Sequence, residues 1–140
     1  MDSTSSLQLI VVCAVALVAG LAFYPTLTTR LRMRDYWQRS CTGRAWVERF
    51  PTARSDDIRR FLHLFVDAFA FPRPRALYFA PTDQIMTIYR TLYPLKDMPD
   101  ALEVETLARR LKTAYGVDLA SIWREDITLG DVFAQVSAAV

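Results

Sequence analysis

The feature that most limits the possible folds of this chain is a long apolar segment near its N-terminus. Residues 7–24 read LQLIVVCAVALVAGLAFY, with Gln8 as the one strongly polar side chain. About 17 to 25 apolar residues in helical form span the hydrocarbon core of a bilayer. The segment has no polar face, which disfavours a helix that packs on the core of a soluble domain. We therefore predict a single transmembrane helix, with residues 1–25 as the anchor and residues 7–24 in contact with the membrane.

A cleavable signal peptide is the competing interpretation of this segment. Such peptides have a positively charged start and a cleavage site of small residues after the apolar run. The first six residues, MDSTSS, carry no positive charge, and no clear small-x-small site follows Tyr24. These features favour an uncleaved anchor.

Basic residues follow the apolar segment directly, whereas Asp2 is the one charged residue before it. Flanking segments rich in Lys and Arg stay in the cytoplasm, so we expect the C-terminal part of the chain to be cytoplasmic. The basic residues on this side are Arg30, Arg32, Arg34, Arg39 and Arg44.

The same flank has a second interpretation, as a surface that recognises anionic lipid. Each basic residue near a charged membrane contributes about 1 kcal/mol to such binding. Aromatic residues gather at the level of the lipid headgroups, which suits Tyr24 and Tyr36 as well as Trp37. The predicted membrane-surface residues are Arg30, Arg32, Arg34 and Trp37.

Beyond the anchor we predict a basic juxtamembrane segment over residues 26–54 and a folded domain over residues 55–140. Ser55 is a candidate N-cap for the first helix of this domain, and acidic residues follow it in the first turn. Trp46 and Phe50, four residues apart, are expected to form a face that docks on the domain. Apolar residues recur along the first helix at helical spacing, namely Ile58, Phe61, Leu62, Phe65, Val66 and Phe69.

A second amphipathic helix is predicted between Asp100 and Gly116. Asp100 is its candidate N-cap, and Glu103 three residues later can complete a capping box. Gly116 can adopt the left-handed conformation that ends many helices. The expected apolar face includes Leu102, Leu107 and Leu111.

The last helix has the most complete start signal in the sequence. Thr128 and Asp131 are three residues apart, as in a capping box, and Ile127 and Val132 are placed to form a hydrophobic staple. We therefore predict a helix that begins just after Thr128, in a domain of the all-α class.

Two motifs of the second helix resemble those of acyl carrier proteins. That family has Asp-Ser-Leu at the start of this helix and a Phe-Gly-Ile type turn at its end. Here Asp100-Ala101-Leu102 and Tyr115-Gly116-Val117 stand in these places. Residues 127–132 also resemble the Thr-Val-Gly-Asp turn that opens the last carrier helix. The resemblance covers about residues 55–140 and implies a small acyl-carrier-like helical bundle.

The sequence departs from that family at two places. Ala101 stands where the family has the serine that carries phosphopantetheine, and alanine has no hydroxyl to esterify, so no cofactor is expected. Carrier proteins present an acidic second helix to basic patches on their enzymes, and like charges there would oppose docking. A mixed, solvated face is the alternative interpretation of this charge pattern. The outer positions of the helix carry Arg109, Arg110 and Lys112, with Glu103 near its start.

Motifs for catalysis or metal binding are not found. The glycines are isolated, and the single histidine, His63, has no recognisable catalytic neighbour. A net charge of +2 does not argue for nucleic-acid binding. We expect a membrane-anchored, non-enzymatic adaptor that binds a protein partner; the alternative is an accessory protein of acyl, lipid or peptide synthesis that binds an acyl group non-covalently. The candidate partner-binding residues are Glu103, Arg109, Arg110 and Lys112.

Overall fold

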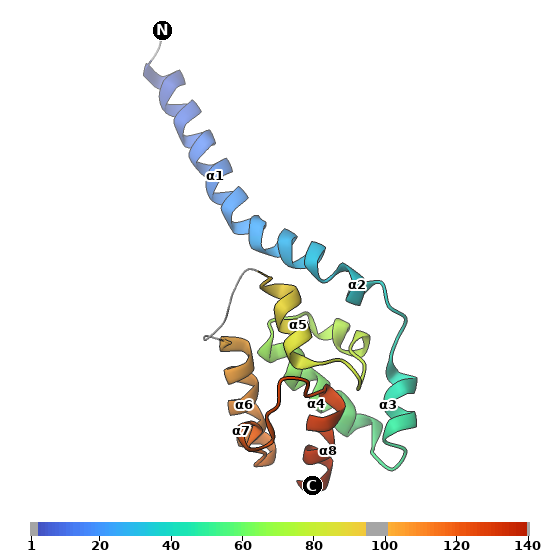
Figure 1. The fold of residues 1–140 in the computed structure, drawn as a ribbon. Helices are drawn as coiled ribbons and strands as arrows, with labels where there is room; N and C mark the ends of the chain where they lie inside the picture. The colour runs from blue at the N-terminus through green and yellow to red at the C-terminus, as the bar shows by residue number, and fades with distance from the viewer. Residues whose placement is uncertain (1–2, 95–100, 140) are drawn as a thin grey trace. The chain divides into compact units, whose positions relative to one another are not determined.

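A computed structural model describes residues 3–94 and 101–139 of the chain. Every regular element in these residues is a helix, which confirms the predicted all-α class (Figure 1). The chain separates into two compact units, Met1–Arg34 and Asp35–Val140.

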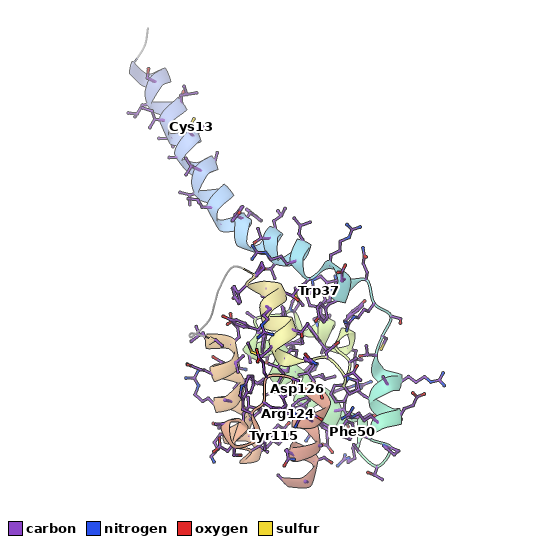
Figure 2. The ribbon with its side chains drawn as sticks, viewed as in Figure 1. Cys13, Trp37, Phe50, Tyr115, Arg124 and Asp126 are labelled. Atoms are coloured by element: carbon purple, nitrogen blue, oxygen red, sulfur yellow. The ribbon has the colours of Figure 1, made fainter. Side chains whose placement is uncertain are left out.

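The first unit is dominated by one helix, α1, which runs Ser3–Arg32. At 1.5 Å per residue it is about 45 Å long, more than the hydrocarbon thickness of a bilayer. Its apolar part is long enough to cross a membrane, and none of that part is buried within the protein. Leu17, for example, is 65% exposed, and side chains such as that of Cys13 project from the helix (Figure 2). The helix therefore has the length and surface of a membrane span and is not a core helix.

The end of α1 lies beyond the expected end of the anchor at residue 25. The helix continues to Arg32, so that Arg30 and Arg32 lie in its last turn. Positive charge there interacts favourably with the negative end of the helix dipole. Two of the arginines predicted at the membrane surface thus belong to α1 itself, and Arg34 begins the next helix.

The second unit consists of short helices around α4, which packs against the following 3-10 helix η1 and against α6 (Figure 1). The short helix α2, at the boundary between the units, spans Arg34–Trp37. The helices that follow are α3 (Gly43–Arg49), α4 (Ser55–Ala68), η1 (Arg73–Tyr78), α5 (Ile85–Leu92), α6 (Leu102–Tyr115), α7 (Leu119–Ile122) and α8 (Leu129–Ala139).

The second unit begins earlier in the chain than the sequence predicts. Residues 35–54 are part of it and do not form a separate juxtamembrane segment. Trp46 of α3 is fully buried, and its ring packs against Phe61 of α4 and Phe133 of α8. The indole N–H of Trp46 donates a 2.8 Å hydrogen bond to the carbonyl of Phe79. The expected docking of Trp46 is confirmed, and the boundary moves to residue 35 because this ring belongs to the core.

The apolar stripe of α4 is buried as predicted, but the start of the helix is different. Ser55 is already helical, and Arg54 occupies the N-cap position without a side-chain hydrogen bond. The carbonyl of Arg54 accepts from the amides of Asp57 and Ile58, which places the first helical turn one residue earlier than expected. The buried residues of the helix are Ile58, Phe61, Leu62, Phe65, Val66 and Ala68.

Two aromatic clusters meet on α4. Phe61 packs against aromatic rings of α3 and α8. Phe65 contacts Phe69, just after α4, and Phe79, just after η1. Tyr36 is buried with its ring 5.5 Å from that of Phe79, so this side chain packs within the second unit. Trp37 packs edge-on against Phe71, Tyr78 and Phe79.

The start of α8 has the capping box that the sequence predicts. The amide of Thr128 donates to Asp131 Oδ2, and the amide of Asp131 donates to Thr128 Oγ1, both at 3.1 Å. Ile127 and Val132 are buried, as expected for a hydrophobic staple. Each residue of the pair thus satisfies an amide that the helix itself leaves free.

The segments that precede α5 and α8 pair with each other. The amide of Ile85 donates to the carbonyl of Ile127, and the amide of Gly130 donates to the carbonyl of Pro81 at 2.8 Å. A Cβ atom at Gly130 would lie 2.7 Å from that carbonyl oxygen. This close approach requires glycine, a requirement that only the pairing of two distant segments creates.

Candidate functional site

The helix α6 carries all four residues predicted to bind a partner. Leu107 and Leu111 are buried as expected, but Leu102 is 66% exposed and does not belong to the apolar face. Gly116 ends the helix in the left-handed conformation, with φ of 69°, as predicted. The outer positions are exposed and basic, occupied by Arg109, Arg110 and Lys112.

The start of α6 is organised by a contact with α5. Ala101 occupies the N-cap position and has no side chain that could cap, while the predicted cap, Asp100, lies outside the described residues. The carboxylate of Glu103 accepts a hydrogen bond from the hydroxyl of Tyr93. Partial burial, and then the neighbouring Glu103 carboxylate, raise the pKa of Tyr93 to about 12. Glu103 therefore has a structural partner at this end of the helix.

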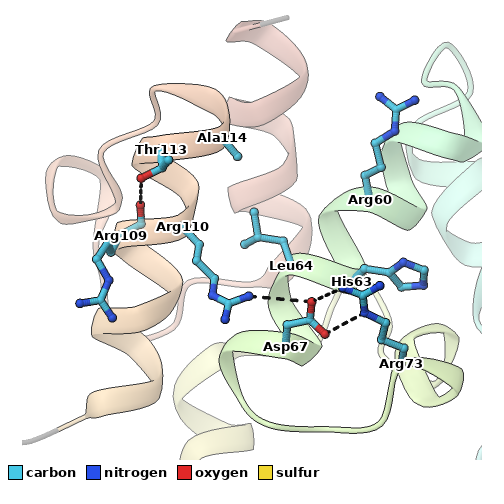
Figure 3. A pocket seen from close by; sticks show the side chains of 9 residues that line it. All are labelled: Arg60, His63, Leu64, Asp67, Arg73, Arg109, Arg110, Thr113 and Ala114. Carbon is cyan, nitrogen blue, oxygen red and sulfur yellow. Dashed lines mark hydrogen bonds and ion pairs between the residues drawn. The ribbon is translucent and has the colours of Figure 1, made fainter.

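A groove lies between α4 and α6, which we call the α4–α6 groove (Figure 3). It has a volume of about 630 Å³. Side chains from α4, η1 and α6 form its walls, so residues from three separate parts of the sequence meet there. The lining residues are Arg60, His63, Leu64, Asp67, Arg73, Arg109, Arg110, Thr113 and Ala114.

The lining of the α4–α6 groove is strongly basic. Its four arginines and one aspartate give a formal charge of +3 with His63 neutral. Charges of one sign that line a concave surface concentrate the electrostatic potential there and attract ions of the opposite sign. The groove is therefore suited to a negatively charged ligand.

Asp67 is the one acid in this groove, and it binds arginines from two other elements. Its carboxylate accepts two hydrogen bonds from Arg73, at 3.0 Å and 2.8 Å, in the bidentate arrangement that favours arginine. The guanidinium of Arg110 lies 3.8 Å from the same carboxylate (Figure 3). Arg73 is the main cause that holds the pKa of Asp67 below its ordinary value. Asp67 thus connects α4 to both η1 and α6.

The remaining two arginines are less fully neutralised. Arg109 donates a 3.4 Å hydrogen bond to the hydroxyl of Thr106, a partner without charge. Arg60 lies 3.7 Å from Asp57, and its side chain is 68% exposed. These two arginines retain most of their capacity to bind an anion from solution.

The structure divides the predicted partner-binding residues. Arg109 and Arg110 line the α4–α6 groove, whereas Glu103 and Lys112 do not. Glu103 lies six residues before Arg109, about 9 Å along the helix axis. The predicted membrane-surface residues are divided as well, because Arg30 and Arg32 belong to α1 and Trp37 packs within the second unit.

The groove residues on α4 were not singled out by the sequence, although a signal is present there. Arg60, His63, Leu64 and Asp67 follow the spacing i, i+3, i+4 and i+7, which marks a second stripe beside the apolar one. Arg73 could not be found in this way, because it reaches the groove only through the turn after α4. Within the residues described, no group of three or more His, Cys, Asp and Glu side chains is placed to hold a metal ion.

Comparisons with protein-family models, with curated proteins and with solved structures find no match for this chain. The resemblance to acyl carrier proteins therefore depends on its sequence motifs alone.

Proposed function

We propose that this protein is a single-pass membrane adaptor whose second unit binds a protein partner in the cytoplasm. The observation that carries this proposal is the α4–α6 groove, a concave basic surface built from three elements of the second unit. In this proposal Arg109 and Arg110 bind the partner together with Arg60 and Arg73. The protein has no catalytic role and carries no phosphopantetheine.

The first unit supports the proposal of a membrane anchor. The apolar surface of α1 is exposed along its length, and exposed apolar surface of this extent needs an apolar environment. Under the positive-inside rule, the arginines at the end of α1 support a second unit on the cytoplasmic side. Anchoring restricts the second unit to the membrane surface and so raises its concentration near other membrane proteins.

The charge of α6 supports a partner different from the enzymes that bind acyl carrier proteins. A basic α6 would face a basic docking patch on such an enzyme, which costs binding free energy. Ala101 also lacks the hydroxyl that attachment of phosphopantetheine requires. We therefore propose a carrier-like fold with a docking surface and without the chemistry of a carrier.

The packing of the core favours this adaptor role over non-covalent acyl binding. Phe61, Phe65 and Phe133 are at most 1% exposed, and Phe61 and Phe133 lie with ring centroids 5.3 Å apart between α4 and α8. An acyl chain held between these helices would have to displace these rings. Displacing a well-packed aromatic side chain costs about 3 kcal/mol.

Site-specific photo-cross-linking of the full-length protein in its native membranes tests the proposal. A photoreactive phenylalanine at Thr113 lies in the groove, and the same residue at the exposed Gln135 of α8 is the matched control. We expect a discrete protein adduct from position 113 and none from position 135. An identical adduct from both positions, or adducts with lipid alone, would contradict the proposal.

A further inference from the structure

The α4–α6 groove combines two properties that together describe its ligand. Its rim carries the positive charge of Arg60, Arg109 and Arg110, while Leu64 and Ala114 contribute apolar surface between them. Leu64 is half-buried, so part of its side chain remains available to a ligand. A ligand that fits must bring negative charge on its outer positions and an apolar side chain in the middle.

We infer that the occupant of this groove is an acidic segment of the protein partner, with carboxylates that pair with Arg60, Arg109 and Arg110. This inference rests on the proposed function and specifies the chemistry of the same site. A protein segment fits better than an anionic bilayer, because a layer of headgroups brings negative charge to the arginines but no apolar side chain to Leu64.

Asp67 has a specific part in this recognition, as an internal carboxylate that competes with the partner. It binds Arg73 in bidentate geometry and lies 3.8 Å from Arg110, so it occupies the position that an incoming carboxylate would take on these arginines. Arg60 and Arg109 are not held in this way and make the first contacts. Asp67 therefore weakens binding of acidic segments and limits the groove to partners with several carboxylates.

The test is a binding titration with the full-length protein in nanodiscs of neutral phosphatidylcholine. The probe is a fluorescent peptide of glutamate, leucine and alanine, and its control has lysine in place of each glutamate. We expect binding of the acidic peptide alone, with an affinity that falls as salt is added. Arg109→Glu should weaken it by about tenfold, because a paired charge becomes a repelling one.

Lys112→Glu is the matched control for Arg109→Glu, because it makes the same change of net charge on α6 outside the groove. We expect it to change the affinity by less than about twofold. Asp67→Asn should tighten binding by about threefold, since it releases Arg110 and Arg73 for the peptide. Asp56→Asn, at the exposed start of α4, is its control and should leave the affinity unchanged. Circular dichroism of each variant verifies that the fold is intact.

The results separate this inference from the proposed function. Three results would each overturn the inference. The acidic peptide does not bind, Lys112→Glu lowers the peptide affinity as much as Arg109→Glu does, or a folded Asp67→Asn variant binds the peptide more weakly than the wild type does. Binding to added phosphatidylserine vesicles that depends on Arg109, without binding of the peptide, would overturn it in favour of a membrane surface. A protein adduct at position 113 without peptide binding refutes only the acidic chemistry, whereas peptide binding without an adduct refutes only the adaptor role.

Discussion

The helices α1 and α4 are both rich in apolar side chains, but the two helices expose them to opposite degrees. Leu17 of α1 is 65% exposed, whereas Phe61 and Phe65 of α4 are fully buried. Apolar residues surround α1 on all sides, and on α4 they form one stripe beside a polar face. The comparison shows that the distribution of apolar residues around the helix axis, more than their number, decides whether a helix buries its apolar surface within its own chain.

The chain just after α4 is held by specific backbone and polar interactions. The turn after α4 closes with the amide of Phe71 donating to the carbonyl of Val66 at 2.8 Å, while Ala70 has φ of 55°. Asp67 then binds Arg73 just beyond this turn. The second unit therefore depends on polar and backbone interactions in addition to burial. Four variants, three in the second unit and one in α1, test the contrast between the second unit and α1.

Trp46→Ala should have the largest effect, because it empties the centre of one aromatic cluster. Loss of a buried aromatic side chain costs about 3–5 kcal/mol of unfolding free energy. Urea unfolding of the full-length protein in micelles measures it, with Val47→Ala, at a neighbouring 51% exposed position, as control. A loss below about 1 kcal/mol would show that α3 is not part of the core.

Leu17→Arg should act on α1 and leave the second unit unchanged. An arginine at the centre of a transmembrane helix costs about 3 kcal/mol of insertion free energy. Extraction of membranes with alkaline carbonate measures the fraction that remains inserted, and Leu17→Ala is the control. Equal retention of both variants would argue against α1 as a membrane span.

Asp131→Asn should remove a pH dependence that belongs to the second unit. Partial burial by itself would raise the pKa of Asp131, but hydrogen bonds from Thr128 and the charges of Arg124 and Arg49 outweigh it and lower that pKa. The resulting stabilisation is present above the ordinary carboxyl pKa, about 3.9, and is lost as the pH falls through the lower value of the folded protein.

Acid unfolding curves of the full-length protein measure this contribution of Asp131. We expect about 1–2 kcal/mol of stability at neutral pH that the Asn variant lacks. The difference should shrink as the pH falls below about 4 and vanish below the lowered pKa of Asp131 in the folded protein. The exposed Asp56→Asn variant serves as the comparison, and a constant difference between Asp131→Asn and wild type at every pH would refute the linkage.

Ala70→Gly should give the smallest effect and the opposite sign. An alanine at φ of 55° is strained, and glycine relieves that strain at some cost in the entropy of the unfolded chain. We expect a net gain of about 0.5–1 kcal/mol in unfolding free energy. Ala68→Gly, at the buried last residue of α4, should instead destabilise by about 0.5–1 kcal/mol, and thermal melts of both variants test the contrast.

Local patterns in the sequence predicted several elements correctly. The stripe of α4, the left-handed Gly116 and the capping box of Thr128 and Asp131 depend on residues within a few positions of one another. The N-cap predicted at Ser55 is wrong by one residue. Residue preference alone does not specify where the extended backbone before the helix ends, and here it ends at Arg54. Leu102 failed because helical spacing does not show where a packed face ends.

The candidate site was predicted in part. Arg109 and Arg110 were identified from the charge of their helix, but their partners on α4 and Arg73 were not. Asp67 and Arg110 are far apart in the sequence, and their ion pair exists only because α4 and α6 pack side by side. No local pattern contains that information.

By itself, the sequence determined the apolar surface of α1, the amphipathic form of α4 and the basic character of α6. These are properties of composition and of spacing within a few turns. Only the tertiary structure decided that Tyr36 belongs to the core, that Gly130 must be glycine and that four arginines share one groove. Each of these depends on the packing of distant segments, because burial and charge proximity are set by what the chain brings together in space.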